Sequence, residues 1–80
     1  MATGTVRFWA AARAAAGQAE QAYDAATLGA VVTALEAEHG AALAKVLTHC
    51  SFLVDGVRAG PDFALSEGAE IEVLPPFAGG

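Results

Sequence analysis

The chain has 80 residues, which suits one small domain, and 55% of them are hydrophobic, which is ample for a core. Its formal net charge of −5, with only four Lys plus Arg, excludes the clustered cations that bind nucleic acids or anionic membranes. The single cysteine excludes a disulfide framework and a four-cysteine iron–sulfur site. The sequence shows no basic and apolar leader and no apolar run of about 20 residues, so we expect a cytoplasmic protein.

The residue pattern predicts one domain over residues 1–80 that mixes strands and helices. Runs of β-branched and large apolar residues predict strands at 5–9, 20–23, 52–54, 57–58 and 71–74. Alanine-rich or apolar-striped runs predict helices at 10–16, 28–39 and 41–47. This order predicts an α+β fold, a mixed sheet of about five strands with one main helix and short helical turns packed on one face.

The main helix has clear ends and one apolar stripe. Thr27 is a plausible N-cap, and Gly40 ends the helix. Gly29 costs about 1 kcal/mol relative to alanine, which the packing of the stripe must outweigh. The stripe has the i, i+3, i+4, i+7 spacing and consists of Leu28, Val31, Val32 and Leu35.

Three turns shape the second half of the chain. Asp55-Gly56 is a strong hairpin signal, and Gly60-Pro61-Asp62 marks a loop. Glu67-Gly68 turns the chain into its last strand. Phe63 and Leu65 are expected to anchor the loop in the core.

The exit from the last strand is stiff. Pro75 and Pro76 follow Leu74, offer no N–H to a sheet ladder and fix φ. The residue before a proline is held extended, so the chain should leave the sheet as a stretched, flexible tail over 75–80 that reaches at most about 20 Å.

The tail ends with the sequence Phe77-Ala78-Gly79-Gly80. Glycine permits close backbone approach, so such an end can carry a carboxylate through a channel that is too narrow for side chains. An exposed aromatic beside it suits a docking hot spot, and we interpret Phe77 as an interface residue rather than a core residue. For Trp9, which is out of phase with Val6 and Phe8, the core is the favoured location and the interface the alternative.

Other reactive side chains have simpler interpretations. No recognisable motif places a base beside Cys50, so we expect it to pack in the core. His39 and His49 match no metal-ligand spacing and are expected to be solvated or at helix ends. Arg13 fits a surface position or a partner face equally well.

Two segments resemble the β-grasp, ubiquitin-like sulfur carriers, above all the small subunits of molybdopterin synthases. Segment 8–17 (FWAAARAAAG) is similar to that family's aromatic–Ala–x–x–Arg–Glu–x–x–Gly segment, and segment 65–80 (LSEGAEIEVLPPFAGG) is similar to its ending. Ala14 replaces the usual Glu, so this segment lacks that family's Arg–Glu pair. Ala69 replaces a common Asp and Phe77 a common Val.

The resemblance implies a carrier without a metal or bound cofactor, rather than an enzyme acting alone. An adenylating, ubiquitin-activating-like enzyme would use ATP on the Gly80 carboxylate, and a sulfur donor such as a cysteine desulfurase or rhodanese-type protein would convert it to a thiocarboxylate. In the large synthase subunit, that sulfur would pass to a cyclic pyranopterin monophosphate. Gly79, which has no side chain, would let the chain end pass through a narrow channel of the partner. The implied partner-binding residues are Leu74, Pro75, Pro76, Phe77, Ala78, Trp9 and Arg13.

Two alternatives remain open. The first is a sulfur carrier for thiazole, cysteine or another thiolated product; thiazole carriers tend to be shorter and to lack the Pro-Pro exit. The second is a ubiquitin-like binding module whose tail has no chemistry. Such a module would keep its function after loss of Gly80, whereas a carrier would lose it.

Overall fold

The computed structural model describes residues 1–76 as one sheet with three helices. The strands are β1 (Ala2–Phe8), β2 (Glu20–Ala25), β3 (Ser51–Val54), β4 (Val57–Arg58) and β5 (Glu70–Leu74). The helices are α1 (Ala10–Ala16), α2 (Leu28–His39) and α3 (Ala41–Leu47). All the predicted elements are present. The first strand differs most from its prediction, since it begins at Ala2 and ends at Phe8.

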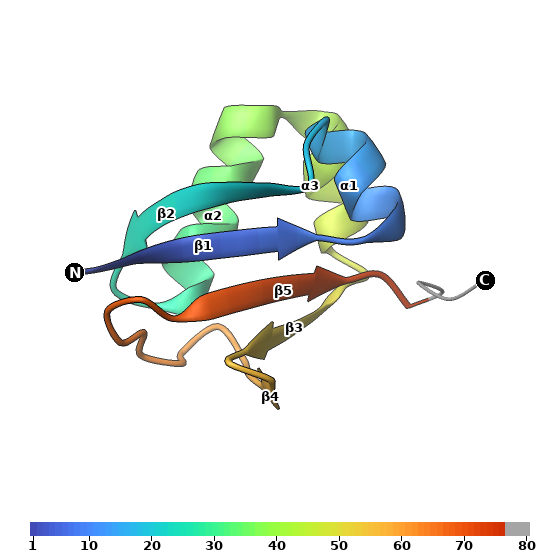
Figure 1. Ribbon diagram of the computed structural model, residues 1–80. Coiled ribbons are helices and arrows are strands. Elements are labelled where there is room, and N and C mark those ends of the chain that lie inside the picture. Colours follow the sequence, from blue (N-terminus) through green and yellow to red (C-terminus); the bar gives the residue numbers. More distant parts are fainter. Residues whose placement is uncertain (77–80) are drawn as a thin grey trace.

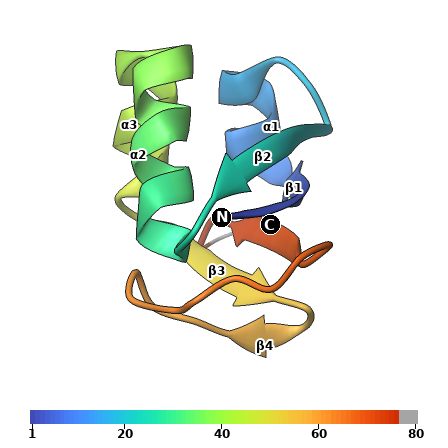
Figure 2. The same ribbon diagram turned by 90° about the vertical axis from the view of Figure 1, so that its left-hand side faces the viewer.

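The strands lie in the order β2-β1-β5-β3-β4, so that the last strand of the chain is central. Strand β5 runs parallel to β1 and antiparallel to β3. The outer pairs, β1 with β2 and β3 with β4, are antiparallel. Figures 1 and 2 show all three helices on one face of this sheet. The expected β-grasp arrangement is confirmed.

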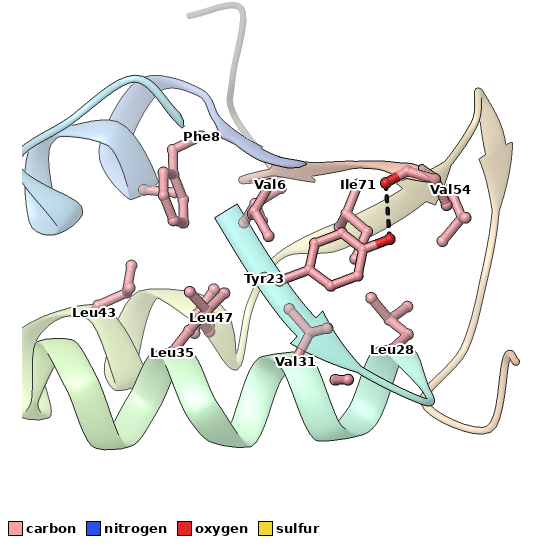
Figure 3. Packing of buried hydrophobic residues seen from close by; sticks show 14 residues of the cluster. Val6, Phe8, Tyr23, Leu28, Val31, Leu35, Leu43, Leu47, Val54 and Ile71 are labelled. Atoms are coloured by element: carbon pink, nitrogen blue, oxygen red, sulfur yellow. Dashed lines mark hydrogen bonds between the residues drawn. The ribbon is translucent and has the colours of Figure 1, made fainter. Parts of the chain in front are cut away.

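The core lies between the sheet and the helices (Figure 3). Alternate residues of β1 and β5 face inward because side chains of a strand point to opposite faces in turn. Each fully buried aliphatic or aromatic side chain contributes roughly 1.5–3 kcal/mol relative to exposure. The sheet contributes Val6, Phe8, Ile71 and Val73, and the helices contribute Leu28, Val31, Leu35, Leu43 and Leu47.

One buried hydrogen bond crosses this core close to the sheet. The Tyr23 hydroxyl donates to the Ala69 carbonyl oxygen at 2.8 Å (Figure 3). Gly4 lies opposite Tyr23 in the β1–β2 pair. A Cβ atom on Gly4 would overlap the Ala69 oxygen and would lie 2.7 Å from the Tyr23 hydroxyl. The tyrosine therefore reaches its acceptor because residue 4 has no side chain.

The predicted ends of α2 are correct. The Thr27 hydroxyl accepts a hydrogen bond from the Ala30 N–H at 3.2 Å, as an N-cap does. At the other end, the N–H of Gly40 donates to the Glu36 carbonyl at 2.9 Å. Gly40 has a φ of 82°, which favours glycine. Helix α3 follows directly.

Backbone carbonyls of the loop before β5 accept hydrogen bonds from the first N–H groups of α2. The N–H of Leu28 donates to the Phe63 carbonyl at 3.0 Å, and the N–H of Gly29 donates to the Pro61 carbonyl at 2.9 Å. The side chain of Phe63 is 40% exposed, so the prediction that it anchors the core is wrong. Instead, the backbone carbonyl of Phe63 holds the loop against the start of α2. Leu65 is partly buried against the core, as predicted.

Trp9 also departs from its prediction. It follows β1 as the N-cap residue of α1, and its side chain is 40% exposed, so the favoured placement in the core is wrong. The reason is that β1 ends at Phe8 and the chain turns at Ala10, whose φ is 48°.

None of the helices among residues 1–76 is long and apolar enough to cross a membrane.

Candidate functional site

The ends of β1 and β5 meet at one border of the sheet, because the two strands are parallel neighbours. Phe8 pairs with Val73 in their register, and the N–H of Trp9 donates to the Val73 carbonyl at 3.3 Å. We call the end of β5 together with Pro75 and Pro76 the tail exit. Hydrogen bonding thus holds the tail exit beside the end of β1.

Trp9 lies over the outer side of this border. Its indole N–H donates to a carboxylate oxygen of Glu72 at 3.2 Å. The ring is held in place while part of it remains in contact with solvent. An amphipathic aromatic ring in such a position matches the side chains that dominate protein interfaces.

An apolar groove of about 470 Å³ lies beside the tail exit on the helix side. Its walls come from the start of α1, the end of α3 and the two prolines. The lining residues are Ala10, Ala11, Val46, His49, Pro75 and Pro76. The small alanines leave the space open, because a methyl group fills little of the gap between α1 and the prolines. The tail exit therefore has an aromatic ring on one side and an apolar groove on the other.

The predicted site residues are only partly gathered here. Leu74 and Pro75 are half-buried, and Pro76 is exposed. Together with Trp9 they surround the tail exit. Residues 77–80, which include Phe77, Ala78, Gly79 and Gly80, lie outside the described residues, so their predicted roles stay predictions.

Arg13 lies apart from the groove. Its side chain is on the exposed side of α1 and lines a separate depression with Gly17 and Gln18. In the described chain its guanidinium makes no ion pair. The two depressions share only Ala10. The fold therefore places Arg13 outside the groove at the tail exit.

Cys50 has the character of a packing residue, as predicted. It is half-buried against the core, and its thiol donates to the Val46 carbonyl at 3.3 Å. Burial raises the pKa of the Cys50 thiol, which disfavours the nucleophilic thiolate at neutral pH. His49 is exposed just after α3, and His39 ends α2 with its Nε2 atom 2.6 Å from the Gln21 amide oxygen.

The described part of this site can present a chain end. Between Met1 and Pro76, no group of three His, Cys, Asp or Glu side chains lies close enough to hold a metal ion. The only titratable group that lines the groove is His49.

A family model matches residues 6–80, and that family is ThiS. The match includes the whole tail exit and continues to the last residue of the sequence. The chain belongs to the ThiS family. Its members are ubiquitin-like sulfur carriers, which are not catalysts themselves and which work with partner subunits and activating enzymes. A comparison with curated protein sequences gave no match.

Solved structures carry the same fold over almost the entire chain. Small archaeal modifier protein 1 from Methanosarcina acetivorans has a TM-score of 0.87 at 26% identity, with 100% of this chain and 98% of that chain covered. The HVO 2177 protein from Haloferax volcanii has a TM-score of 0.80 at 33% identity, with 99% and 87% covered. A Pyrococcus furiosus protein named as subunit 1 of a molybdopterin converting factor has a TM-score of 0.80, covers 95% and 99%, and at 18% identity shares the fold.

Sequence reasoning missed the groove and the partner of Trp9. Val46 belongs to an ordinary apolar helix pattern, and His49 follows it without a motif. Glu72 meets Trp9 only because β1 and β5 are parallel neighbours, and parallel pairing of strands at opposite ends of a chain leaves no local signal. The repeated small residues Ala10 and Ala11 after an aromatic were the one available hint.

Proposed function

We propose that this protein is the small, sulfur-carrying subunit of a molybdopterin synthase. The observation that carries the proposal is the tail exit, where the central strand β5 ends in Pro75-Pro76 just before a Gly-Gly sequence. The strand anchors the base of the tail, and the prolines stiffen its departure. The Pro-Pro exit favours this role over a thiazole carrier.

The proposed chemistry begins at the Gly80 carboxylate. One carboxylate oxygen attacks the α-phosphorus of ATP in the activating enzyme, which forms an acyl-adenylate and releases pyrophosphate. Hydrosulfide or an equivalent sulfur donor then attacks the carbonyl carbon, the bond to AMP breaks, and Gly80 becomes a thiocarboxylate. Adenylation is needed because a free carboxylate has no good leaving group.

Sulfur transfer would follow in the large synthase subunit. The thiocarboxylate sulfur attacks a side-chain carbon of a cyclic pyranopterin monophosphate, and an oxygen on that carbon departs as a phosphate oxygen or as water. Water then cleaves the resulting thioester at the Gly80 carbonyl, which leaves the sulfur on the pterin and returns Gly80 to a carboxylate. Two such rounds supply the two sulfurs of a dithiolene. We assign the acid and base groups for these steps to the partner, which is supported by the way members of the family work with partner subunits.

Reconstitution tests the proposal. We expect the protein, incubated with ATP, an activating enzyme and sulfide, to exchange one oxygen for sulfur at Gly80. Addition of the large synthase subunit and the cyclic pterin should then give molybdopterin and the original mass. A Cys50→Ala chain should behave in the same way. Sulfur found on Cys50, or a charged carrier that never discharges in the synthase, would contradict the proposal.

A second candidate is a role as a protein modifier. It is favoured by the likeness to small archaeal modifier protein 1, at 26% identity over the entire chain. In that role the activated Gly80 carboxyl would be transferred to an amine of another protein, rather than exchanged for a thiocarboxylate. Covalent adducts that carry the whole chain, detected by mass spectrometry of a reaction with ATP and activating enzyme, would identify it.

A further inference from the structure

Strand β2 forms an open border of the sheet. It hydrogen-bonds only to β1 among the described strands, so its other edge is unpaired. The opposite border of the sheet, β4, consists only of Val57–Arg58. With the bounds Glu20–Ala25, β2 is therefore the long open edge among residues 1–76. Open edges can pair with an added strand.

The register tells which backbone groups point outward. The N–H of Phe8 donates to the Ala19 carbonyl at 2.8 Å, directly before the β1–β2 register begins. Hydrogen-bonded and non-bonded pairs alternate along an antiparallel ladder. The N–H and C=O groups of Glu20, Ala22 and Asp24 therefore point away from β1. These groups are spaced as an incoming strand requires.

A groove of about 130 Å³ runs along this edge, between β2 and α2. Residues 21–25 line one side of it, and Ala34 and Leu35 lie on the other. The α2 wall is apolar except at one end, where the Gln21 amide donates to the Glu38 carboxylate at 3.2 Å. Ala34 is exposed and small, so it leaves the groove open. A long side chain with an apolar stem and a charged head fits this shape.

The two charged side chains that line the groove, Asp24 and Glu38, are both carboxylates. No Lys or Arg occurs between Arg13 and Lys45, whereas four carboxylates do: Glu20, Asp24, Glu36 and Glu38. Glu20 lies 3.4 Å from the Arg7 guanidinium, and Glu38 lies 3.7 Å from the His39 Nε2 atom, which carries a charge only when the ring is protonated. A second copy of this chain added at β2 would bring carboxylates together, and like charges across strands are destabilising. The groove therefore favours a cationic occupant.

We propose that β2 and its groove bind an extended, cationic segment of a partner protein, which adds as a strand to the β2 edge. The backbone groups of Ala22 and Asp24 supply main-chain hydrogen bonds. One Lys or Arg of the segment lays its aliphatic stem along Ala34 and Leu35 and places its charged head at Glu38. This interaction does not depend on the chemistry of the tail.

Synthetic peptides test the proposal on the full chain. The probe is the capped heptapeptide Thr-Val-Lys-Val-Lys-Val-Thr, with Gln and Glu versions at the two lysine positions. By amide NMR we expect the Lys peptide to shift the signals of 20–25 and to slow hydrogen exchange at Ala22 and Asp24. N-methylation of alternate peptide nitrogens should weaken binding about tenfold, as expected from the loss of two hydrogen bonds. The Glu peptide should not bind.

Matched variants separate the groove from general electrostatics. Ala34→Phe fills the groove from an exposed position and should abolish binding at an unchanged melting temperature. Glu38→Gln should weaken the Lys peptide about two- to fivefold, as for a partly exposed ion pair. Asp62→Asn makes the same charge change in the loop after β4 and should have no effect. A Gly79→Val chain should bind normally, which keeps this test independent of the proposed function.

Three results would overturn the proposal. The first is no shift at β2 with any of the peptides at millimolar concentration. The second is equal binding of the Lys and Glu peptides. The third is a concentration-dependent shift of β2 without peptide, which would show that a second copy takes the edge.

Discussion

The indole N–H of Trp9 donates to the Glu72 carboxylate at 3.2 Å, which joins the end of β1 to β5 where the tail departs. Trp9→Ala should therefore weaken binding to the large synthase subunit by about 1–3 kcal/mol, as loss of an aromatic anchor does. Stability should change little, since the side chain is 40% exposed. Calorimetry over a salt series measures this, and moderate salt should matter less than the substitution because buried contacts are weakly screened.

Arg13→Ala is the matched control for Trp9. The Arg13 side chain lines a separate depression, so its removal should cost less affinity than the removal of Trp9. The interface assignment fails if Trp9→Ala binds as tightly as the unchanged protein while salt or Arg13→Ala weakens binding strongly.

A second prediction concerns Gly4. An alanine there would bring its Cβ onto the Ala69 oxygen and against the Tyr23 hydroxyl. Overpacking of this kind costs typically about 1–3 kcal/mol. Gly4→Ala should therefore lower the denaturation midpoint, whereas Gly60→Ala, with nothing within 4 Å of its Cβ, should not. Tyr23→Phe in the Gly4→Ala background should restore part of the loss, since the hydroxyl is one of the clashing groups.

Gly29 tests the loop that covers the start of α2. Helix propensity alone predicts that alanine gains about 1 kcal/mol there. A Cβ on Gly29 would lie 3.0 Å from the Pro61 carbonyl oxygen, which already accepts the Gly29 N–H. We expect Gly29→Ala to bring no gain in unfolding free energy. The matched change Ala37→Gly, on the exposed side of α2, should cost about 1 kcal/mol.

Gly29 also shows where sequence reasoning ends. Local signals located α2 and its Thr27 cap, because spacing and capping chemistry act within a few residues. The same local signals predict only that Gly29 destabilises the helix. The Pro61 carbonyl, which leaves little room for a side chain at residue 29, lies far along the chain and is therefore invisible to them. Phe63 was placed in the core on hydrophobicity alone, although its backbone, not its ring, is what the fold uses.

The site was predictable to a similar extent. The prolines and the resemblance located the tail exit from sequence, because the stop signals are covalent properties of proline. The groove beside it was not predictable, since it forms between α1, α3 and the prolines, and their distance from one another is set by packing. Trp9 was assigned to the core although it is out of phase with the buried Val6 and Phe8, and this phase was the signal that its side chain lies elsewhere.

Glu67 gives the fold a defined response to acid. Its carboxylate accepts hydrogen bonds from the side chain and the N–H of Thr3, and these bonds hold the pKa of Glu67 below its ordinary value of about 4.5. A carboxyl whose pKa is lower in the folded state stabilises the fold above its unfolded pKa. That contribution is lost as the pH falls from about 4.5 through the folded pKa.

The measurement is the melting temperature between pH 7 and pH 3. Glu67→Gln should be less stable than the unchanged protein at pH 7, and the difference should shrink as the pH falls. Glu36→Gln, which removes one carboxylate from α2, should give a smaller difference in melting temperature from the unchanged protein. A difference for Glu67→Gln that grows on acidification would mean that these hydrogen bonds do not act on the ionised carboxyl.

The last prediction separates the tail from the fold. Gly79 follows Pro75-Pro76 in sequence, after the last strand has ended, so Gly79→Val should leave the melting temperature nearly unchanged. Sulfur loading should respond differently. A β-branched side chain restricts the backbone and widens the chain end, and a misplacement of about 1 Å can cost on the order of a hundredfold in rate. We therefore expect a folded protein that is adenylated very slowly or is inert in the synthase. Gly60→Val, on the exposed loop after β4, should load normally. Both rates and melting temperatures are measured on the same preparations, and a folded Gly79→Val protein with normal loading and transfer would show that the glycines do not serve threading.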